Sequence, residues 1–294
     1  MQLRKAERKQ AKLRIGLSAP SGAWKTYSAL LLAYWICNDW SKIALIDTEN
    51  WSWELYSHLW EYNVLNLQAP FSPERYIEAI ESCENAWIEI IIIDSISHEW
   101  EWSWGCLEIN DKLAQAKYKW NTWAAWSETT PRHQKFIEKI TSSDVNIITT
   151  VRNKVETAQV NWKVKKVWIK EQTREGFEYE LTVNFNIDRD WHLAVASKDR
   201  TRLFIDKDPF VISEETWKQI LDWNLSWKKV KTKEENFEEY KLKLENCDSL
   251  ECITNISDEL KKEFENSWKF LDKKQLEEIG KIANERKKEF TEES

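Results

Sequence analysis

The feature that most restricts the fold of this chain is an almost uninterrupted apolar run, "IEIIIID", at residues 88–94. A strand that is apolar on both faces is typical of a parallel sheet covered by helices on both sides. Further strand-like runs occupy residues 13–19, 42–49, 63–68 and 145–151, and helical patterns separate several of them. The alternation predicts an α/β fold with a mostly parallel central sheet.

The helical patterns have recognisable boundaries. Helices are predicted over residues 25–34, 72–86 and 131–143. In the second of these, Ser72 is suited to the N-cap and Pro73 to the first helical position, because proline lacks the N–H that a helix start leaves unpaired.

The pattern changes after residue 160. Three further strand-like runs predict an antiparallel extension of the sheet, at 163–169, 177–188 and 192–199. Residues 228–294 are rich in Lys and Glu, with 15 basic and 18 acidic residues and apolar residues at helical spacing. We predict two domains, residues 1–227 and residues 228–294, the second a linker with a small charged helical module.

The segment "GLSAPSGAWKT" at residues 16–26 lies between a predicted strand and a predicted helix, which is the setting of a phosphate-binding loop. Backbone N–H groups at such a helix start bind phosphate, and the helix dipole favours the anion. Lys25 is suited to neutralising the β- and γ-phosphates, and the Thr26 hydroxyl to binding Mg²⁺. The predicted nucleotide-binding residues are Ala19, Pro20, Ser21, Gly22, Ala23, Trp24, Lys25, Thr26 and Tyr27, with Lys25 also catalytic.

Trp24 conflicts with this interpretation, because the residue before the lysine is glycine where the backbone must approach the phosphates closely. The chain has 20 Trp and 5 Gly among 294 residues, whereas glycine ordinarily makes up about 7% of a protein. Together the two types number 25, an ordinary glycine content with a few tryptophans added. Some bacteria and their phages read the UGA codon as glycine, so reading UGA as tryptophan would produce this composition.

Several tryptophans also occur where a turn is expected, as in "VNWKV" and "DRDWH", and glycine there would give ordinary hairpin turns. The alternative is a Trp-rich protein whose tryptophans lie on apolar faces. We predict glycine in place of Trp24, Trp35, Trp51, Trp53, Trp87, Trp102, Trp104, Trp120, Trp162, Trp168, Trp191, Trp217 and Trp227. Trp100, Trp126 and Trp223 have apolar settings suited to genuine tryptophan, and Trp40, Trp60, Trp123 and Trp268 are left unassigned.

Polar residues at the ends of the predicted strands complete the candidate site. Asp94 ends the apolar strand and, with Thr26, is predicted to hold Mg²⁺; a helix cap or turn residue is the alternative. Glu49, in "LIDTE", is the candidate base for the attacking water, and an ordinary loop residue is the alternative. Thr150 and Arg152, in "IITTVRNK", are suited to sensing the γ-phosphate.

These motifs resemble a known family. A phosphate loop followed by strands ending "IDTE" and "IIIDS" resembles the RecA-type ATPase core, which places its catalytic glutamate at the position of Glu49. More closely, "LRIGLSAPSGAWKTYSALLLA", "IIIDSISHEWEWSW", "TTPRHQKF", "TTVRNK" and "ASKDRT" resemble phage-encoded RecA-like ATPases associated with single-strand annealing recombination. The resemblance covers about residues 5–227. In that family the loop position of Trp24 is typically glycine, as are those after "DTE" and "HEW".

The resemblance implies an ATPase with ATP and Mg²⁺ as cofactors, single-stranded DNA as partner, and a homo-oligomer. RecA-type proteins complete the ATP site with basic residues of a neighbour; Lys198 and Arg200 are the candidates, and a surface turn is the alternative. The candidate DNA-binding residues are basic and could neutralise backbone phosphates without sequence preference. They are Lys154, Lys163, Lys165, Lys166, Lys170 and Arg174, for which an exposed charged hairpin is the alternative explanation.

The remaining composition limits the class of protein. The net charge is −7, so the chain as a whole is not the polycation that nucleic-acid binding often requires. Five cysteines without metal-ligand spacing predict free thiols in a reducing cytoplasm. No apolar run is long enough to span a membrane, so we expect a cytoplasmic protein without membrane contact.

Two alternatives to an ATPase acting on single-stranded DNA remain at this stage. One is a phosphate-loop ATPase of another phage process, such as packaging or replication. The other is a DNA-binding or scaffold protein with an inactive nucleotide site, which a genuine tryptophan at position 24 would produce.

Overall fold

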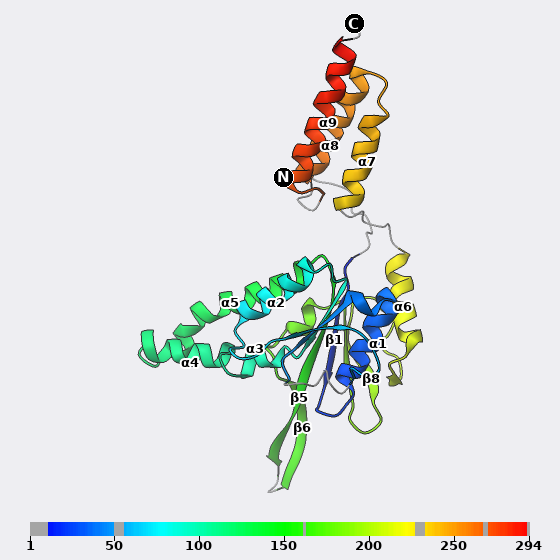
Figure 1. The fold of residues 1–294 in the computed structure, drawn as a ribbon. Coiled ribbons are helices and arrows are strands. Elements are labelled where there is room, and N and C mark those ends of the chain that lie inside the picture. The colour runs from blue at the N-terminus through cyan, green and yellow to red at the C-terminus, as the bar shows by residue number, and fades with distance from the viewer. Residues whose placement is uncertain (1–10, 50–55, 161–162, 227–232, 267–269, 293–294) are drawn as a thin grey trace. The chain divides into compact units, whose positions relative to one another are not determined.

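The computed structural model describes residues 11–49, 56–160, 163–226, 233–266 and 270–292. The chain forms two compact units (Figure 1), of which the larger is Ala11–Ser226. The described part of the smaller unit consists of helices α7 (Lys233–Glu245), α8 (Leu250–Asn266) and α9 (Lys273–Glu292).

The larger unit is built on one sheet with the strand order β3-β2-β4-β5-β1-β7-β8-β9, to which β6 adds by pairing with β5. The strands are β1 (Arg14–Ala19), β2 (Ile43–Asp47), β3 (Asn63–Asn66), β4 (Ile90–Asp94), β5 (Asn146–Val160), β6 (Lys163–Glu171), β7 (Val183–Ile187), β8 (Leu193–Asp199) and β9 (Phe210–Val211). The strands from β3 to β7 in this order pair in parallel, and β6, β8 and β9 pair antiparallel with their neighbours.

Helices cover both faces of this sheet (Figure 1). They are α1 (Lys25–Cys37), α2 (Pro73–Asn85), α3 (Ser97–Glu101), α4 (Cys106–Lys117), α5 (Thr122–Ser142) and α6 (Glu214–Leu225). One apolar core forms between the sheet and α1 with α6, and a second forms between the sheet and α2 with α5. Because both faces are covered, all five residues of β4 are buried, as its apolar sequence predicts.

The predicted α/β fold, with its mostly parallel sheet, antiparallel extension and helical module, is confirmed. Three local predictions were wrong. The strand predicted at 145–151 continues to Val160 as β5, because its second half pairs with β6. Residues 177–180 form a 3₁₀ turn instead of a strand, and pairing resumes only at β7. Helix α5 begins at Thr122, where the Asn121 side chain accepts a hydrogen bond from the backbone N–H of Ala124, and continues through Pro131.

Packing explains why α5 tolerates an internal proline. Pro131 has no N–H, so one hydrogen bond of the helix is missing. Helix α5 nevertheless buries residues at helical spacing along its length, namely 125, 129, 133, 136 and 140. One continuous face of α5 is therefore packed against the rest of the protein on both sides of the proline.

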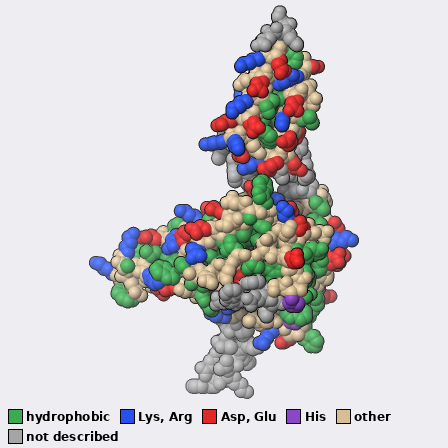
Figure 2. All heavy atoms as spheres, viewed as in Figure 1, with side chains coloured by type: hydrophobic (Ala, Val, Ile, Leu, Met, Phe, Trp, Pro, Cys, Tyr) green, Lys and Arg blue, Asp and Glu red, His purple; other side chains and the backbone are tan. Residues whose placement is uncertain are grey.

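The smaller unit has an apolar core of its own, to which Tyr240, Leu244, Ile253 and Ile279 contribute buried side chains. Its surface carries interspersed acidic and basic side chains (Figure 2). The structure therefore shows the Lys/Glu-rich region as a solvated three-helix module in its described part.

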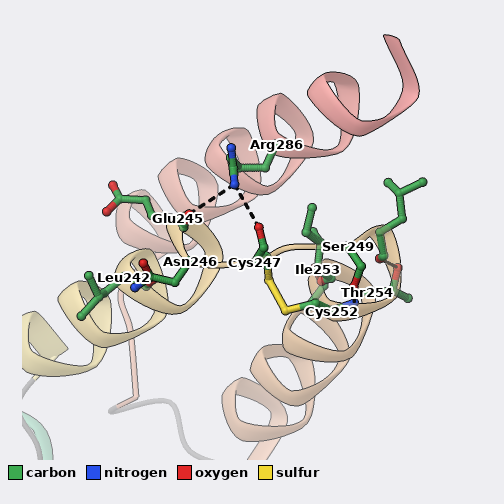
Figure 3. Close-up of a disulfide and its surroundings, with 11 residues drawn as sticks. Leu242, Glu245, Asn246, Cys247, Ser249, Cys252, Ile253, Thr254 and Arg286 are labelled. Carbon is green, nitrogen blue, oxygen red and sulfur yellow. Dashed lines mark hydrogen bonds between the residues drawn. A yellow bond between two sulfur atoms is a disulfide. The ribbon is translucent and has the colours of Figure 1, made fainter. Parts of the chain in front are cut away.

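A disulfide joins Cys247 and Cys252 across the turn between α7 and α8 (Figure 3). Their Cα atoms are 5.7 Å apart, within the usual range for this bond. Arg286 of α9 donates hydrogen bonds to the carbonyl oxygens of Glu245 and Cys247, at 3.3 and 3.0 Å. The prediction of free thiols was therefore wrong for this pair, because the turn brings together cysteines only five positions apart, whereas Cys37, Cys83 and Cys106 are free.

Among the described residues, no helix has both the length and the apolar character needed to cross a membrane.

Candidate functional site

The predicted phosphate loop lies between the end of β1 and the start of α1. Gly22 and Trp24 have φ values of 81° and 59°, so the backbone turns through the left-handed region twice before the helix begins. Trp24 is the residue that precedes α1, and its side chain makes no capping hydrogen bond. The backbone at the helix start is the usual setting for binding an anion.

Lys25 is the first residue of α1, and only 7% of its surface is exposed. Its Nζ donates a hydrogen bond to the Pro20 carbonyl oxygen at 3.3 Å. Burial lowers the pKa of Lys25, and the charges of Asp94 and Glu49 oppose this effect. The ammonium group therefore lies within the loop, where it can exchange a carbonyl partner for a phosphate oxygen.

Asp94 is fully buried at the end of β4 and accepts a hydrogen bond on each carboxylate oxygen. Thr26 Oγ1 donates to Oδ2, and Thr150 Oγ1 donates to Oδ1, both at 2.5 Å. Burial and the charge of Glu49 raise the pKa of Asp94 to about 6, although the two hydroxyls oppose the shift. A carboxylate and a hydroxyl in contact form an oxygen-rich position of the kind that Mg²⁺ prefers.

The topology explains this convergence. Strand β5 lies between β1 and β4, and all three run in the same direction. The carboxyl ends of β1 and β4 therefore share one edge of the sheet with residues 150–152 of β5, which continues beyond that edge to Val160. This edge of an open parallel sheet is where ligands bind in α/β proteins.

Glu49 follows β2 at the same edge and forms an ion pair with Arg152, whose Nε lies 2.6 Å from Glu49 Oε1. Burial opposes ionisation of Glu49, but the hydrogen bond and charge of Arg152, together with Lys25, outweigh it and lower the pKa of Glu49. The backbone N–H of Arg152 donates to Ser97 Oγ at 2.9 Å, which fixes β5 against α3.

A cavity of 490 Å³ opens beside this ion pair. Its lining includes Glu49 and Arg152, together with Gln68, His98 and Trp102. Burial and the charge of Arg152 lower the pKa of His98 to about 4, so the ring is neutral at pH 7. No role at this site was predicted for Ser97 or His98, although both lie in the "ISHEW" stretch that follows Asp94.

The Trp24 side chain lies outside this polar cluster. Its indole stacks on His192 in the β7–β8 turn, with ring centroids 3.9 Å apart, and it contacts Tyr27 edge-on. The side chain is 53% exposed, which is unusual for a tryptophan that serves as core.

Lys198 and Arg200 lie away from the phosphate loop of their own chain. Lys198 pairs with Asn184 of β7, which pairs with Gly16 near the start of β1, so both basic residues lie at the edge opposite the phosphate loop. The Arg200 guanidinium donates to the carbonyl oxygen of Tyr179.

Asp199, between these two residues, organises the loop that follows. Its carboxylate accepts hydrogen bonds from the backbone N–H groups of Thr201, Arg202, Phe204 and Ile205. Burial opposes its ionisation, but these donors and the Thr201 hydroxyl lower the pKa of Asp199 below 3.8.

Asp199→Ala is expected to destabilise the protein by about 1–3 kcal/mol, because several backbone donors lose a charged acceptor. Chemical denaturation at pH 7 measures this, with Asp208→Ala as the control in an exposed position of the same region. Because the pKa of Asp199 is lowered in the folded protein, its contribution to stability is present above the ordinary aspartate pKa. The stability difference between Asp199→Ala and the unmodified protein should therefore shrink as the pH falls below that ordinary value toward the lowered pKa of the folded state. Equal stability of the two variants would contradict the role of Asp199.

The candidate DNA-binding residues occupy β5, β6 and the segment after them. Lys154 Nζ is 2.7 Å from Glu101 Oε2, and the Arg174 guanidinium lies over the Trp126 ring at 5.8 Å. Lys163, Lys165, Lys166 and Lys170 lie on β6, which pairs antiparallel with β5. The structure thus groups these positions on one hairpin and beside its base, apart from the Asp94 cluster.

The family model described as an AAA domain matches residues 11–210. Among solved structures, a KaiC-like protein from the hyperthermophilic archaeon Pyrococcus horikoshii is similar with a TM-score of 0.36 and 13% identity, over 69% of this chain and 86% of that one. The search of curated proteins gave no match. Since the matched residues make up more than half of the chain, the protein belongs to the AAA domain family.

Proposed function

We propose that this protein binds and hydrolyses ATP with Mg²⁺, and that it does so at the carboxyl edge of the sheet. The observation that supports this most directly is the contact of Asp94 with Thr26 beside the buried Lys25. Thr26 and Asp94 would hold Mg²⁺, which would supply charge neutralisation for the phosphates. Lys25 and the backbone at the start of α1 would bind the phosphate oxygens.

Glu49 is the proposed base. Water attacks the γ-phosphorus, the bond to the β-phosphate oxygen breaks, and Glu49 takes the proton from the water. Without nucleotide Glu49 is held by Arg152, and a γ-phosphate would compete for that guanidinium because arginine binds phosphate oxygens well. Competition of this kind would free the carboxylate when ATP is present.

We also propose that the native residue at position 24 is glycine. Within the described ranges, four of the nine non-glycine residues with positive φ are tryptophans, namely Trp24, Trp87, Trp104 and Trp120, and glycine is predicted from the sequence at all four. A bulky residue in this region is a genuine outlier, whereas glycine adopts it without strain. Trp87 and Trp120 are also 74% and 73% exposed.

The other predicted glycine positions divide into three groups. Trp102 and Trp191 are exposed, as the proposal favours. In the β7–β8 turn, however, the residue with positive φ is His192 and not its neighbour Trp191. Trp35 is half-buried and Trp217 is buried, so these two positions do not support glycine. The positions 51, 53, 162 and 227 lie outside the described residues, and for Trp168 only the backbone is described.

Mass spectrometry of the protein isolated from its natural source tests the recoding directly. Glycine is expected in the peptide that contains position 24, and tryptophan in the peptide that contains Trp126, which stacks on Trp100. Tryptophan at position 24 in that material would refute the recoding and would favour the scaffold alternative.

Single-stranded DNA is the proposed partner, in phage recombination or annealing. Helix α3 supports a connection between the ATP site and the hairpin, because Ser97 binds the backbone of Arg152 while Glu101 accepts hydrogen bonds from Lys154 and Gln172. Arg152 itself belongs to β5, the first strand of the hairpin, so a change at Arg152 would act on the basic hairpin both directly and through α3.

Hydrolysis measured with and without DNA tests this partner, using protein with glycine at position 24. Single-stranded DNA is expected to raise the ATPase rate, and Glu101→Gln to weaken that stimulation while leaving the basal rate unchanged. No stimulation by any DNA would favour an ATPase of another phage process, such as packaging or replication.

A homo-oligomer is the proposed assembly. Lys198 and Arg200 lie at the edge of the sheet opposite the phosphate loop of their own chain. If they act on ATP, they must act on that of a neighbouring copy.

A further inference from the structure

Three side chains with different metal-binding atoms meet inside the helical region that follows Asp94. Glu99 comes from α3, Cys106 from α4 and His133 from α5. Their ligand atoms all lie within 4.8 Å of one another, and the three residues are 1%, 0% and 4% exposed. Cys106 Sγ lies 3.0 Å from Glu99 Oε1, and His133 Nδ1 lies 3.1 Å from both Glu99 oxygens.

We propose that Glu99, Cys106 and His133 bind a zinc ion. Carboxylate oxygen, thiolate sulfur and imidazole nitrogen are the three ligand types that zinc uses in proteins. The site differs from the proposed Mg²⁺ position, where hydroxyl and carboxylate oxygens suit a harder cation.

The charge of the cluster favours this assignment. With Glu99 ionised, Cys106 as thiolate and His133 neutral, the ligands carry two negative charges, which Zn²⁺ balances in a buried position. Zinc would replace the thiol proton, which is released to solvent, so binding should weaken as the pH falls.

The geometry is close to that of a bound ion but requires adjustment. Bonds of about 2.0–2.3 Å in a tetrahedral site place ligand atoms roughly 3.3–3.8 Å apart. The two separations from Glu99, of 3.0 and 3.1 Å, must therefore widen by a few tenths of an ångström, and the separation between the Cys106 and His133 ligand atoms, which is within 4.8 Å, must settle in the same range. Three protein ligands leave one position of the tetrahedron, which a single water molecule would fill.

The location gives the metal a structural role. Glu99 belongs to the same short helix as Ser97 and Glu101, which bind Arg152 and Lys154. A zinc ion would attach this helix to α4 and α5 and so hold it against the carboxyl end of β5. The cysteine spacing alone could not predict such a site, because each ligand comes from a different helix and only one is a cysteine.

The alternative is a metal-free cluster in which the thiol and imidazole simply hydrogen-bond to Glu99. Cys106→Ser separates the two explanations, because serine keeps a donor for Glu99 but is a far weaker zinc ligand than a thiolate. It also leaves the Glu99–His133 pair intact, so folding is preserved better than with a substitution of either partner. Cys83→Ser is the matched control, since Cys83 is another buried free thiol outside the cluster.

The test uses the full chain, treated with a chelator and then titrated with Zn²⁺ or Co²⁺ alone. One zinc per chain, and a thiolate-to-cobalt charge-transfer band that Cys83→Ser retains and Cys106→Ser loses, would support the proposal. Zinc affinity should fall at least about 10-fold in Cys106→Ser. Absence of stoichiometric metal binding, or an unchanged cobalt spectrum in Cys106→Ser, would overturn it. The readout is independent of ATP hydrolysis.

Discussion

Trp24→Gly is expected to strengthen ATP binding by about two orders of magnitude relative to the chain with tryptophan. The physical reason is close approach: under the proposed function phosphates would bind to backbone N–H groups at this turn, and a bulky side chain at position 24 would hold them away. Loss of about two hydrogen bonds to a charged group corresponds to roughly 3 kcal/mol, or about 100-fold in affinity. Titration of both proteins with a fluorescent ATP analogue and Mg²⁺ measures the difference.

Two control variants make this result specific. Trp24→Ala removes the indole but retains a Cβ at a φ of 59°, so it should recover only part of the affinity. Trp191→Gly removes another exposed tryptophan, 77% exposed and outside the loop, and should leave ATP binding unchanged. If the proteins with tryptophan and glycine at position 24 bind ATP equally, the steric explanation is wrong. If neither binds, the ATPase proposal itself fails.

Glu49→Gln, in protein with glycine at position 24, should lower kcat for ATP hydrolysis by about 10²–10⁴-fold, the usual contribution of a positioned general base. Glutamine has nearly the same shape as glutamate but cannot accept the proton of the attacking water. ATP affinity should change little, because the phosphates are bound by the loop and Lys25. Steady-state hydrolysis and nucleotide titration together separate these two effects.

The chain offers a close control for this variant. Glu74 forms an ion pair with Arg132, with Glu74 Oε1 2.6 Å from Arg132 Nε, and so repeats the Glu49–Arg152 arrangement outside the site. Glu74→Gln should therefore hydrolyse ATP at the unmodified rate. A Glu49→Gln protein that retains its rate within a few-fold would show that another group is the base.

The central part of the candidate site was predictable because parallel strands end at a common edge. The sequence alone places Lys25 and Asp94 after β1 and at the end of β4, and Thr150 near the end of the strand predicted at 145–151; the structure brings their side chains into one polar cluster, although β5 continues past Thr150 to Val160. Local patterning also predicted Ser72 and Pro73 at the start of α2.

The remaining features depend on contacts between distant segments. Glu99 and His133 are 34 positions apart and meet only because α3 and α5 pack together, which no periodicity indicates. The start of α5 could not be predicted from Pro131, which ordinarily marks a helix boundary, because a buried face that continues through the proline holds the helix. The pairing of Glu49 with Arg152 likewise depends on how the segment after β2 approaches β5 across 103 positions.

The insertion of β5 between β1 and β4 determines how the Asp94 carboxylate is turned. Thr26 and Asp94 belong to segments that are not neighbours in the sheet, yet Thr26 Oγ1 reaches Asp94 Oδ2 directly, while Thr150 on the intervening strand donates its hydroxyl to Oδ1. A glycine at position 150 would leave Asp94 Oδ1 without its donor. Threonine at this point therefore fixes the rotation of a buried carboxylate, with its other oxygen facing Thr26.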